Sequence, residues 1–347
     1  MTTTPAPDAP ALGLLVLGGT SWLGGALARQ AVARGHRVTC LARGESGEPP
    51  AGVTWVRADR DRPTAYDEVR GRAWDSVLDV SWQPDQVRSA LAALAPSARH
   101  WVYVSSGSVY ADDDVPHTGE DSPLHEPHRE PGPVGVEQYG PAKVACELAC
   151  LDAMGADRVF APRAGLIAGY GDRSDRLGYW PARVARAEDG EPVLVPPTDA
   201  PVQVIDVEDL AEWLVRVAEG QVAGVVNAVG DTTTVADVLA ACVEASSRTP
   251  RFVAADDAWL TEQGVAPWAG EQSLPLWLPQ PAYAGFMTRR NDAAHRSGLR
   301  LRPVRDTVAA ALEWERSSGL DRDRRAGLTP DRERELLARL AGDSPTP

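Results

Sequence analysis

A tyrosine and a lysine four residues apart form the pair in this sequence whose chemistry is easiest to read. They lie in "EQYGPAKVACE", residues 137–147, and Lys143 is the only lysine of the chain; every other member of the 35 lysines and arginines is an arginine. Residues four apart share one face of a helix, so Tyr139 and Lys143 can converge there. Pro141 fits the first turn of such a helix, where its missing N–H costs nothing.

This pair predicts acid–base chemistry. A free phenol has a pKa of about 10, roughly three units too high to exchange a proton with a carbinol near neutral pH. A fixed cation nearby stabilises the phenolate, and a compact ammonium can also donate to cofactor hydroxyls. Taken singly, Tyr139 is equally typical of a half-buried helix tyrosine and Lys143 of a solvated lysine. Together they favour catalysis.

Three serines are candidates for a third catalytic group. In "HWVYVSSGSVYAD", Ser105, Ser106 and Ser108 come at the end of a predicted strand. They are therefore expected at the carboxyl edge of a parallel sheet, where ligands bind and where a hydroxyl can donate to a substrate carbonyl. Serines also favour strand-end turns for local reasons, so these residues alone do not establish a site.

A glycine-rich turn predicts a dinucleotide cofactor. The stretch "LLVLGGTSWLGGALARQAVARGHRVTCLARG" reads as strand, turn, helix and strand, with glycines at 18, 19, 24 and 25. Such a turn lets the backbone approach a pyrophosphate at a helix N-terminus, which offers free N–H groups and partial positive charge. Its position in the first βαβ unit makes the signal fairly specific.

The residues after the second and third strands bear on the choice of cofactor. Ala42 stands where an acid would accept from the 2′-hydroxyl of NAD, and Arg43 follows it. A basic residue suits the 2′-phosphate of NADP, so NADP(H) is preferred and NAD(H) remains possible. The alternative for Arg43 is an exposed loop arginine. Asp59 is expected to accept from the adenine amino group or, alternatively, to cap a turn.

Alternating strands and helices must position these groups, and this pattern is typical of a doubly wound parallel sheet of Rossmann type. A smaller, mostly helical C-terminal substrate domain is expected after it. The predicted strands are 14–17, 37–41, 54–57, 76–80 and 100–105, and the predicted helices are 22–34 and 84–94. The predicted segments are a disordered N-terminus (1–11), a dinucleotide-binding domain (12–170), a substrate domain (171–340, with 202–230 returning to the sheet) and a disordered tail (341–347).

Composition limits the classes of partner. The formal charge of −14 over 347 residues argues against nucleic acid or an anionic membrane. No run of 18 apolar residues or signal peptide is present, so a cytoplasmic protein is expected. Three of the six histidines fall in the Pro-rich loop 107–138. Their spacing matches no common zinc pattern, so a solvated lid is favoured there and no metal is predicted.

Together these segments resemble the extended short-chain dehydrogenases/reductases, the NAD-dependent epimerase/dehydratase family. The glycine loop, "SSGSVY", "YGPAK" and "APRAGLIAGYGD" occur in the family's order over residues 12–230. "LGGTSWLG" further resembles a sub-branch that also holds chloroplast stem-loop RNA-binding proteins. Two features depart from the family's pattern: Ser21 replaces the middle glycine, and the acid for NAD is missing.

The resemblance implies roles for individual residues. Tyr139 is the expected general acid/base, Lys143 lowers its pKa and holds the nicotinamide ribose, and Ser106 polarises the substrate. The turn formed by Arg163, Ala164 and Gly165 is expected beside the nicotinamide. The predicted cofactor-binding residues are Gly18, Thr20, Ser21, Trp22, Leu23, Gly24, Arg43, Asp59, Ser105, Tyr139, Lys143, Arg163 and Gly165.

In the family, the loop at 169–183 contacts substrate. Its arginines are expected to clamp a phosphate or carboxylate, and its tryptophans to stack on a ring; the alternative is a charged surface loop with tryptophans that pack the domain. The predicted substrate residues are Trp82, Ser108, Arg173, Arg176, Tyr179, Trp180 and Arg183.

The leading functional prediction is an NADPH-dependent reductase of a small ketone, in which Tyr139 supplies the proton. The first alternative is an epimerase or dehydratase that retains NAD and acts on a nucleotide-sugar-like substrate. The second is a non-catalytic, cofactor-sensing or RNA-binding relative, which the complete Tyr/Lys/Ser set and the negative charge oppose. The family resemblance also suggests a homodimer.

Overall fold

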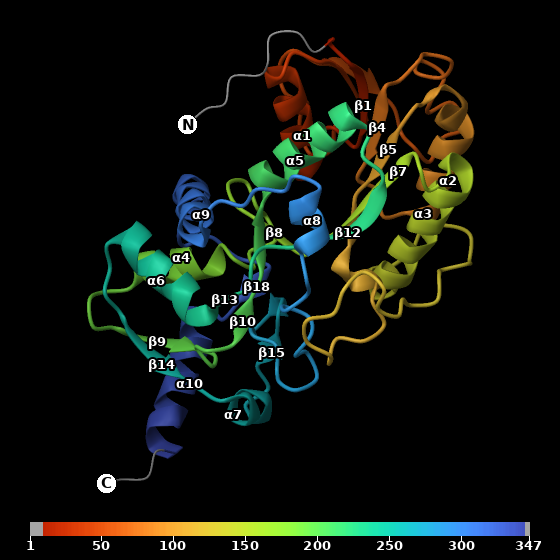
Figure 1. Cartoon of the computed structure of the whole chain (residues 1–347). Helices are drawn as coiled ribbons and strands as arrows, with labels where there is room; N and C mark the ends of the chain where they lie inside the picture. Colours follow the sequence, from red (N-terminus) through yellow and green to blue (C-terminus); the bar gives the residue numbers. More distant parts are fainter. Residues whose placement is uncertain (1–9, 344–347) are drawn as a thin grey trace.

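An eight-stranded parallel sheet forms the centre of one half of the molecule in the computed structural model, which describes residues 10–343 (Figure 1). Its strand order is β12-β7-β5-β4-β1-β2-β3, with β6 paired to β7. The strands are β1 (Gly13–Leu17), β2 (Arg37–Ala42), β3 (Thr54–Arg57), β4 (Ser76–Asp79), β5 (Trp101–Tyr103), β6 (Ser105–Ser106), β7 (Val159–Ala164) and β12 (Gly224–Ala228). The predicted doubly wound Rossmann-type sheet is confirmed.

Helices cover both faces of this sheet, as a fully buried parallel sheet requires. Helices α1 (Trp22–Ala33) and α5 (Val207–Gly220) pack on one face, and α2 (Pro84–Leu94) and α3 (Tyr139–Met154) on the other (Figure 1). The side chains of β1 alternate between the two resulting cores: Leu14 and Val16 join the α1/α5 side, whereas Leu15 and Leu17 join the α2/α3 side. The central strand is therefore buried throughout.

The predicted strand 100–105 is divided into β5 and β6 at Val104. Strand β5 pairs with β4 on one side and β7 on the other, while β6 pairs with β7 alone, through Ser105↔Arg163 and Ser106↔Ala164. The chain thus leaves β4 as it reaches the serines, and this opens the carboxyl edge of the sheet. The other predicted strands and helices of this half agree with the structure to within one residue at each end.

The rest of the chain builds a second core at the other end of the molecule (Figure 1). Helices α4, α6 and α9 pack together there, and α10 packs against β9. Its helices are α4 (Tyr179–Arg186), α6 (Val235–Ser246), α7 (Asp257–Glu262), α9 (Val304–Ser318) and α10 (Pro330–Asp343). Its strands form five short ladders: β8 (Leu166–Ala168) with β11 (Val204–Asp206), β9 (Pro192–Val195) with β14 (Arg251–Ala254), β10 (Pro201–Val202) with β13 (Thr233–Thr234), β15 (Ala266–Pro267) with β17 (Ser273–Leu274), and β16 (Gly270–Glu271) with β18 (Ala326–Gly327). The short helix α8 (Asp292–Arg296) instead packs against β12 of the large sheet.

Both ends of the chain, residues 1–11 and 341–347, were predicted to be disordered. Residues 1–9 and 344–347 lie outside the described part of the chain, so most of the predicted disorder falls there. Residues 341–343 belong to α10, so for these the prediction of a disordered tail is wrong. No helix within residues 10–343 has the length and apolar character needed to cross a membrane.

The loop 107–138 is bound to the chain around residues 285–290 rather than free. Arg289 forms an ion pair with Asp113 at 2.6 Å, and the N–H of Gly285 donates to the Asp113 carbonyl at 2.6 Å. Farther along the loop, the carboxylate of Glu120 accepts from the backbone N–H of Asn227 at 2.9 Å. These bonds hold the loop in place, while residues 111–133 are exposed or only partly buried, so the loop is solvated as expected. Its role as a lid stays a prediction. Within residues 10–343, no group of three or more His, Cys, Asp or Glu side chains is placed to hold a metal.

Candidate active site

Tyr139 and Lys143 converge as their spacing predicts. Tyr139 is the first residue of α3, and Lys143 follows one turn later with its ammonium 5.9 Å from the centre of the Tyr139 ring. The ammonium is buried and donates to the carbonyls of Val104 at 2.7 Å and Ser81 at 3.1 Å. Among the described residues, no carboxylate lies within 4 Å of it. Carbonyl dipoles therefore hold this charge without cancelling it.

The phenol of Tyr139 lies beside Trp82, one of the predicted substrate residues. Tyr139 is partly buried, and the centres of the two rings are 5.4 Å apart. Trp82 comes three residues after the end of β4 and one residue after Ser81, whose carbonyl binds Lys143. The carboxyl edge of the sheet thus brings an acid–base group, a cation and an aromatic wall together.

Of the predicted serines, Ser106 and Ser108 bond to each other. Ser106 accepts from the Ser108 N–H at 3.1 Å and donates to its hydroxyl at 3.2 Å, at the start of a 3-10 turn (Gly107–Val109). Ser105 instead donates to Glu147 inside the protein. The Ser105 hydroxyl is therefore not available to a cofactor, and a contact through the Ser105 backbone stays a prediction.

Arg163 is also turned away from the expected cofactor site. Its guanidinium is buried and bonded to both oxygens of Glu147, at 3.1 and 2.9 Å. The remaining nitrogen donates to the Tyr110 hydroxyl at 3.1 Å and to the Glu120 carbonyl at 2.9 Å. With its donors occupied, the Arg163 side chain joins β7 to α3 and is not available to a cofactor; a contact through the backbone of the turn formed by Arg163, Ala164 and Gly165 stays a prediction.

The glycine loop has the shape that a pyrophosphate site requires. Gly18 has φ +90°, and a Cβ at Gly24 would collide with the Gly18 carbonyl oxygen. Ser21 caps α1: its hydroxyl accepts from the Gly24 N–H at 3.2 Å and donates to the Gly18 carbonyl at 2.8 Å. The N–H groups of Trp22 and Leu23 begin the helix, where intrahelical partners are lacking. Ser21 therefore closes the turn while leaving donors for an anion.

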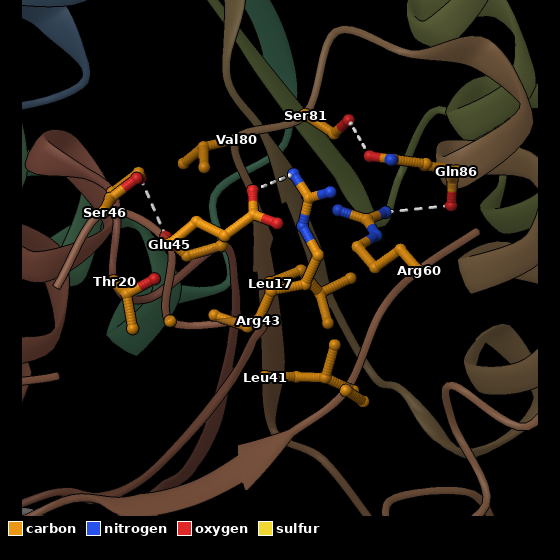
Figure 2. Close-up of a pocket in the computed structure, with 15 residues that line it drawn as sticks. Leu17, Thr20, Leu41, Arg43, Glu45, Ser46, Arg60, Val80, Ser81 and Gln86 are labelled. Atoms are coloured by element: carbon orange, nitrogen blue, oxygen red, sulfur yellow. Dashed lines mark hydrogen bonds and ion pairs between the residues drawn. The ribbon is translucent and has the colours of Figure 1, made fainter. Parts of the chain in front are cut away.

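Figure 2 shows the pocket next to this loop, a cavity of about 170 Å³. Arg43 lies in it, half exposed, and forms an ion pair with Glu45 at 3.0 Å. Asp59 is not among the lining residues; its carboxylate accepts from the Asp61 N–H, so the alternative of a turn cap is what the structure shows. The lining residues are Leu17, Gly18, Thr20, Ser21, Leu41, Ala42, Arg43, Gly44, Glu45, Ser46, Ala58, Arg60, Val80, Ser81 and Gln86.

Two lining residues that sequence reasoning missed are Arg60 and Glu45. Arg60 is bonded to both oxygens of buried Asp79, at 2.6 and 2.8 Å. It also donates to the Gln86 carbonyl at 2.9 Å, as Figure 2 shows. No local pattern identifies that role, because the partners come from other elements. Glu45, by contrast, follows Arg43 by two residues in "ARGES". An acid so close to the end of the second strand is a local sequence signal that could have identified it.

Three of the predicted substrate residues are core or ion-pair residues. Tyr179 and Trp180 are fully buried in the second core, and the Trp180 indole donates to the Pro275 carbonyl at 2.9 Å. Arg183 is bound by Glu333 at 2.6 Å and Glu191 at 2.8 Å. Because α4 begins at Tyr179 and packs against α6 and α9, these predictions are wrong.

The two other arginines of this loop differ from each other. Arg173 is exposed, and we do not assign it to the site. Arg176 is partly buried, with its guanidinium carbon 5.2 Å from the centre of the Trp268 ring. Burial lowers the pKa of Arg176, while the negative charges of Asp172 and of an ionised Tyr139 act in the opposite direction. The predicted substrate role of Arg176 stays a prediction.

Comparisons with known proteins agree with this geometry. Residues 83–229 match the model of the NAD dependent epimerase/dehydratase family. A curated relative, chloroplast stem-loop binding protein of 41 kDa b from Arabidopsis thaliana, is 30% identical over 126 residues, and the match covers 31% of this chain and 33% of that protein. The chain thus spans about a third of the length of the curated relative it matches.

Solved structures share the fold over most of the chain. A putative epimerase from Burkholderia cenocepacia superposes with a TM-score of 0.66 at 19% identity, covering 89% of this chain and 100% of that one. UDP-glucose 4-epimerase from Thermus thermophilus, solved in complex with NAD, gives 0.63 at 18% identity with the same coverage. Residues 83–229 are therefore similar to the NAD dependent epimerase/dehydratase family, and the chain shares the fold of these solved epimerases.

Proposed function

We propose that this protein is an NAD(P)-dependent epimerase or dehydratase acting on a sugar-like small molecule. The observation that carries the proposal is the buried, uncancelled ammonium of Lys143 beside the Tyr139 phenol. A nicotinamide, when bound, supplies a hydride acceptor that can return the hydride to the same substrate. The family match over 83–229 favours this reading over the reductase that the sequence ranked first.

The residues of the chain would divide the work as follows. Tyr139 removes the proton from a substrate hydroxyl and later returns it. Lys143 stabilises the phenolate by its charge and donates to a ribose hydroxyl. Ser106 exchanges its bond to Ser108 for one to the substrate oxygen. Trp82 packs against the substrate ring and limits the access of water.

The glycine loop would hold the pyrophosphate of the dinucleotide. The N–H groups of Trp22 and Leu23 lie in the first turn of α1, where they have no intrahelical partners and can donate to a phosphate. Thr20 and Ser21 line the adjoining pocket, where Arg43 and Glu45 would face the adenosine ribose. The predicted contact at Gly165 stays a prediction; a Cβ there would come within 2.9 Å of Val229, so close packing alone already requires glycine.

A second candidate is the NADPH-dependent reductase. One observation favours it: Arg43 lines the cofactor pocket directly after Ala42, with no acid at the strand end itself. Glu45 opposes it, because an acid at that position attracts a ribose hydroxyl and repels a phosphate. The balance between Arg43 and Glu45 therefore decides between NADP and NAD.

The decisive experiment is to denature freshly purified protein and identify any released nucleotide by mass spectrometry, then to titrate empty protein with NADH and NADPH. Stoichiometric NAD carried through purification is expected if the hydride returns to the same molecule. Empty protein that binds NADPH much more tightly than NADH would overturn the epimerase/dehydratase proposal in favour of the reductase. Failure to bind either nucleotide would refute both enzymes.

The name of the Arabidopsis relative raises a non-catalytic, RNA-binding alternative. The charge of −14 opposes it, because backbone contacts to nucleic acid need a basic face. We expect a small-molecule substrate, no nucleic-acid partner and a homodimer. A gel-shift assay with structured RNA and analytical ultracentrifugation test these expectations. RNA binding that survives physiological salt would contradict the first two.

A further inference from the structure

A second cavity lies at the end of the molecule away from α3. It has a volume of about 460 Å³ and is lined by residues from α4, from α10, from the start of β9 and from the segment that joins α9 to α10. Figure 1 shows α4, β9 and α10 at the opposite end of the molecule from α3. The lining shares no residue with the cofactor pocket and includes none of Tyr139, Lys143 and Ser106. This cavity is therefore separate from the candidate active site.

Arg186 brings to this cavity a guanidinium that has no hydrogen-bond acceptor among the described residues. The Arg186 side chain is 19% exposed, and its Nε is buried without a partner. A carboxylate oxygen of Asp321 lies 3.8 Å from Nη1, but Asp321 is 92% exposed, so solvent screens this pair. Arg186 lies in the last turn of α4, where the helix carbonyls favour a cation, yet it donates to none of them. Its charge is thus mostly buried and left unmatched.

The other charged residues that line the cavity are already paired. Arg183 donates to Glu333 at 2.6 Å and to Glu191 at 2.8 Å. Arg334 is exposed and pairs with Asp331. The cavity therefore keeps one unmatched positive charge, and the carboxylates of Glu191 and Glu333 would repel a second negative charge on a ligand.

Neighbouring cations make the position of Arg186 unfavourable without a ligand. Burial and the charges of Arg324 and Arg183 lower the pKa of Arg186, because each disfavours the charged guanidinium. Arg324 is itself bound to Glu315 at 2.6 Å, so its charge is held in place. Such uncompensated groups in a cavity are characteristic of binding sites, where a ligand supplies the missing charge.

The rest of the lining is apolar. Pro192, Leu328, Pro330 and Leu337 contribute to it, and Leu328 belongs to the second core. A ligand with a hydrocarbon body would remove this apolar surface from water. The volume of the cavity lies within the range of roughly 300–1,000 Å³ that is typical of small-molecule sites. Charge and apolar surface together indicate a ligand that combines the two.

We propose that this cavity is a second ligand site, which binds an organic monoanion: a carboxylate carried by an apolar chain or ring. The planar guanidinium of Arg186 would bind both carboxylate oxygens, and the hydrocarbon body would lie against Leu328 and Leu337. A phosphate dianion fits less well, because Glu191 and Glu333 line the same cavity. The site is independent of the proposed function.

Calorimetric titrations of the full chain with hexanoate, hexanamide, acetate and inorganic phosphate test the class of ligand. We expect hexanoate to bind. Hexanamide should bind roughly 10- to 100-fold more weakly because it lacks the charge, and acetate by a similar factor because it lacks the apolar chain. Absence of hexanoate binding, equal binding of hexanamide, or phosphate binding as tight as that of hexanoate would overturn the inference.

Substitution of Arg186 tests whether the ligand binds in this cavity. Arg186→Met should weaken hexanoate roughly 10- to 100-fold, and Arg186→Lys should recover only part of the loss. The matched control is Arg316→Met, because Arg316 is an exposed arginine in the last turn of α9 and does not line the cavity. The control should bind hexanoate within about twofold of wild type. An unchanged affinity in Arg186→Met would refute the site.

Thermal melting separates a binding role of Arg186 from a structural one. Arg186→Met removes an unmatched, mostly buried charge, so without ligand its Tm should equal or exceed that of wild type. Hexanoate should raise the Tm of wild type and not that of Arg186→Met. A Tm of Arg186→Met well below that of wild type would mean that Arg186 holds the fold together, and would overturn the inference.

A last titration separates this site from the candidate active site. Saturating NADH and the Tyr139→Phe substitution should each leave the affinity for hexanoate within about twofold of wild type. The second site therefore stands or falls independently of the proposed function. Displacement of hexanoate by NADH would place the carboxylate in the cofactor site and overturn the inference.

Discussion

Lys143 and Glu147 lie one turn apart on α3 and are equally buried, yet their charges are handled in opposite ways. The ammonium of Lys143 donates to backbone carbonyls and, among the described residues, has no carboxylate partner. The carboxylate of Glu147, by contrast, is matched by the guanidinium of Arg163 and the hydroxyl of Ser105. A buried charge that is matched supports architecture, and one that is left unmatched is free to act on a neighbouring group. The contrast separates the catalytic face of the helix from its structural face.

The largest expected effect is on turnover and concerns the face of α3 that carries Tyr139 and Lys143. Tyr139→Phe is expected to lower turnover about 10²- to 10⁴-fold, because it removes the proton-exchanging hydroxyl and leaves the ring in contact with Trp82. Initial rates at saturating cofactor measure the effect, and an unchanged melting curve serves as the control. A turnover within tenfold of wild type would show that the acid–base group lies elsewhere.

The next largest effect is on stability and concerns the ion pair between Glu147 and Arg163. Arg163→Met leaves Glu147 as an unpaired buried carboxylate, so we expect the free energy of unfolding to fall by about 3–5 kcal/mol. Urea denaturation measures it. The matched control is Lys143→Met, which removes an equally buried cation without stranding a carboxylate and should cost less than half as much. Equal losses in the two variants would remove the distinction between the two faces of α3.

The sequence predicts the meeting of Tyr139 and Lys143 better than the ion pair of Arg163 and Glu147. Tyr139 and Lys143 are four residues apart, so helical periodicity alone brings them together. Arg163 and Glu147 are sixteen residues apart and on different elements. Local patterns report the helix and the strand but not which charges meet across them. The family resemblance placed Arg163 beside the nicotinamide, and no local pattern indicated its pairing with Glu147.

Distance along the chain also explains the errors in the loop 169–183. Whether Trp180 stacks on a ligand or fills a core depends on Pro275, 95 residues away, and the pairing of Arg183 depends on Glu333, 150 residues away. The glycine loop, by contrast, is a local feature, and its strand, turn and helix were predicted within one residue. Long-range packing is what the sequence pattern lacks.

Arg43 and Glu45 form an intermediate case, a surface pair in which each charge is only partly matched. Arg43→Ala is expected to weaken NADPH relative to NADH about threefold to tenfold, and Glu45→Ala to shift the ratio in the opposite direction, because the 2′-phosphate is attracted by the guanidinium and repelled by the carboxylate. Parallel titrations with both nucleotides measure the ratio. If neither variant changes it, the pair lies outside the adenosine site.

Ser21 gives the smallest expected effect and tests whether a structural residue can sit inside a functional loop. Its hydroxyl caps α1, so Ser21→Ala should cost about 1 kcal/mol of stability and Ser21→Gly only a few tenths. Affinity for the cofactor should change little in Ser21→Gly, because the N–H groups of Trp22 and Leu23 remain. A large loss of nucleotide binding in Ser21→Gly, without loss of stability, would mean that the hydroxyl itself contacts the pyrophosphate. Ser21 would then join Lys143 among the groups whose polarity serves the ligand and not the fold.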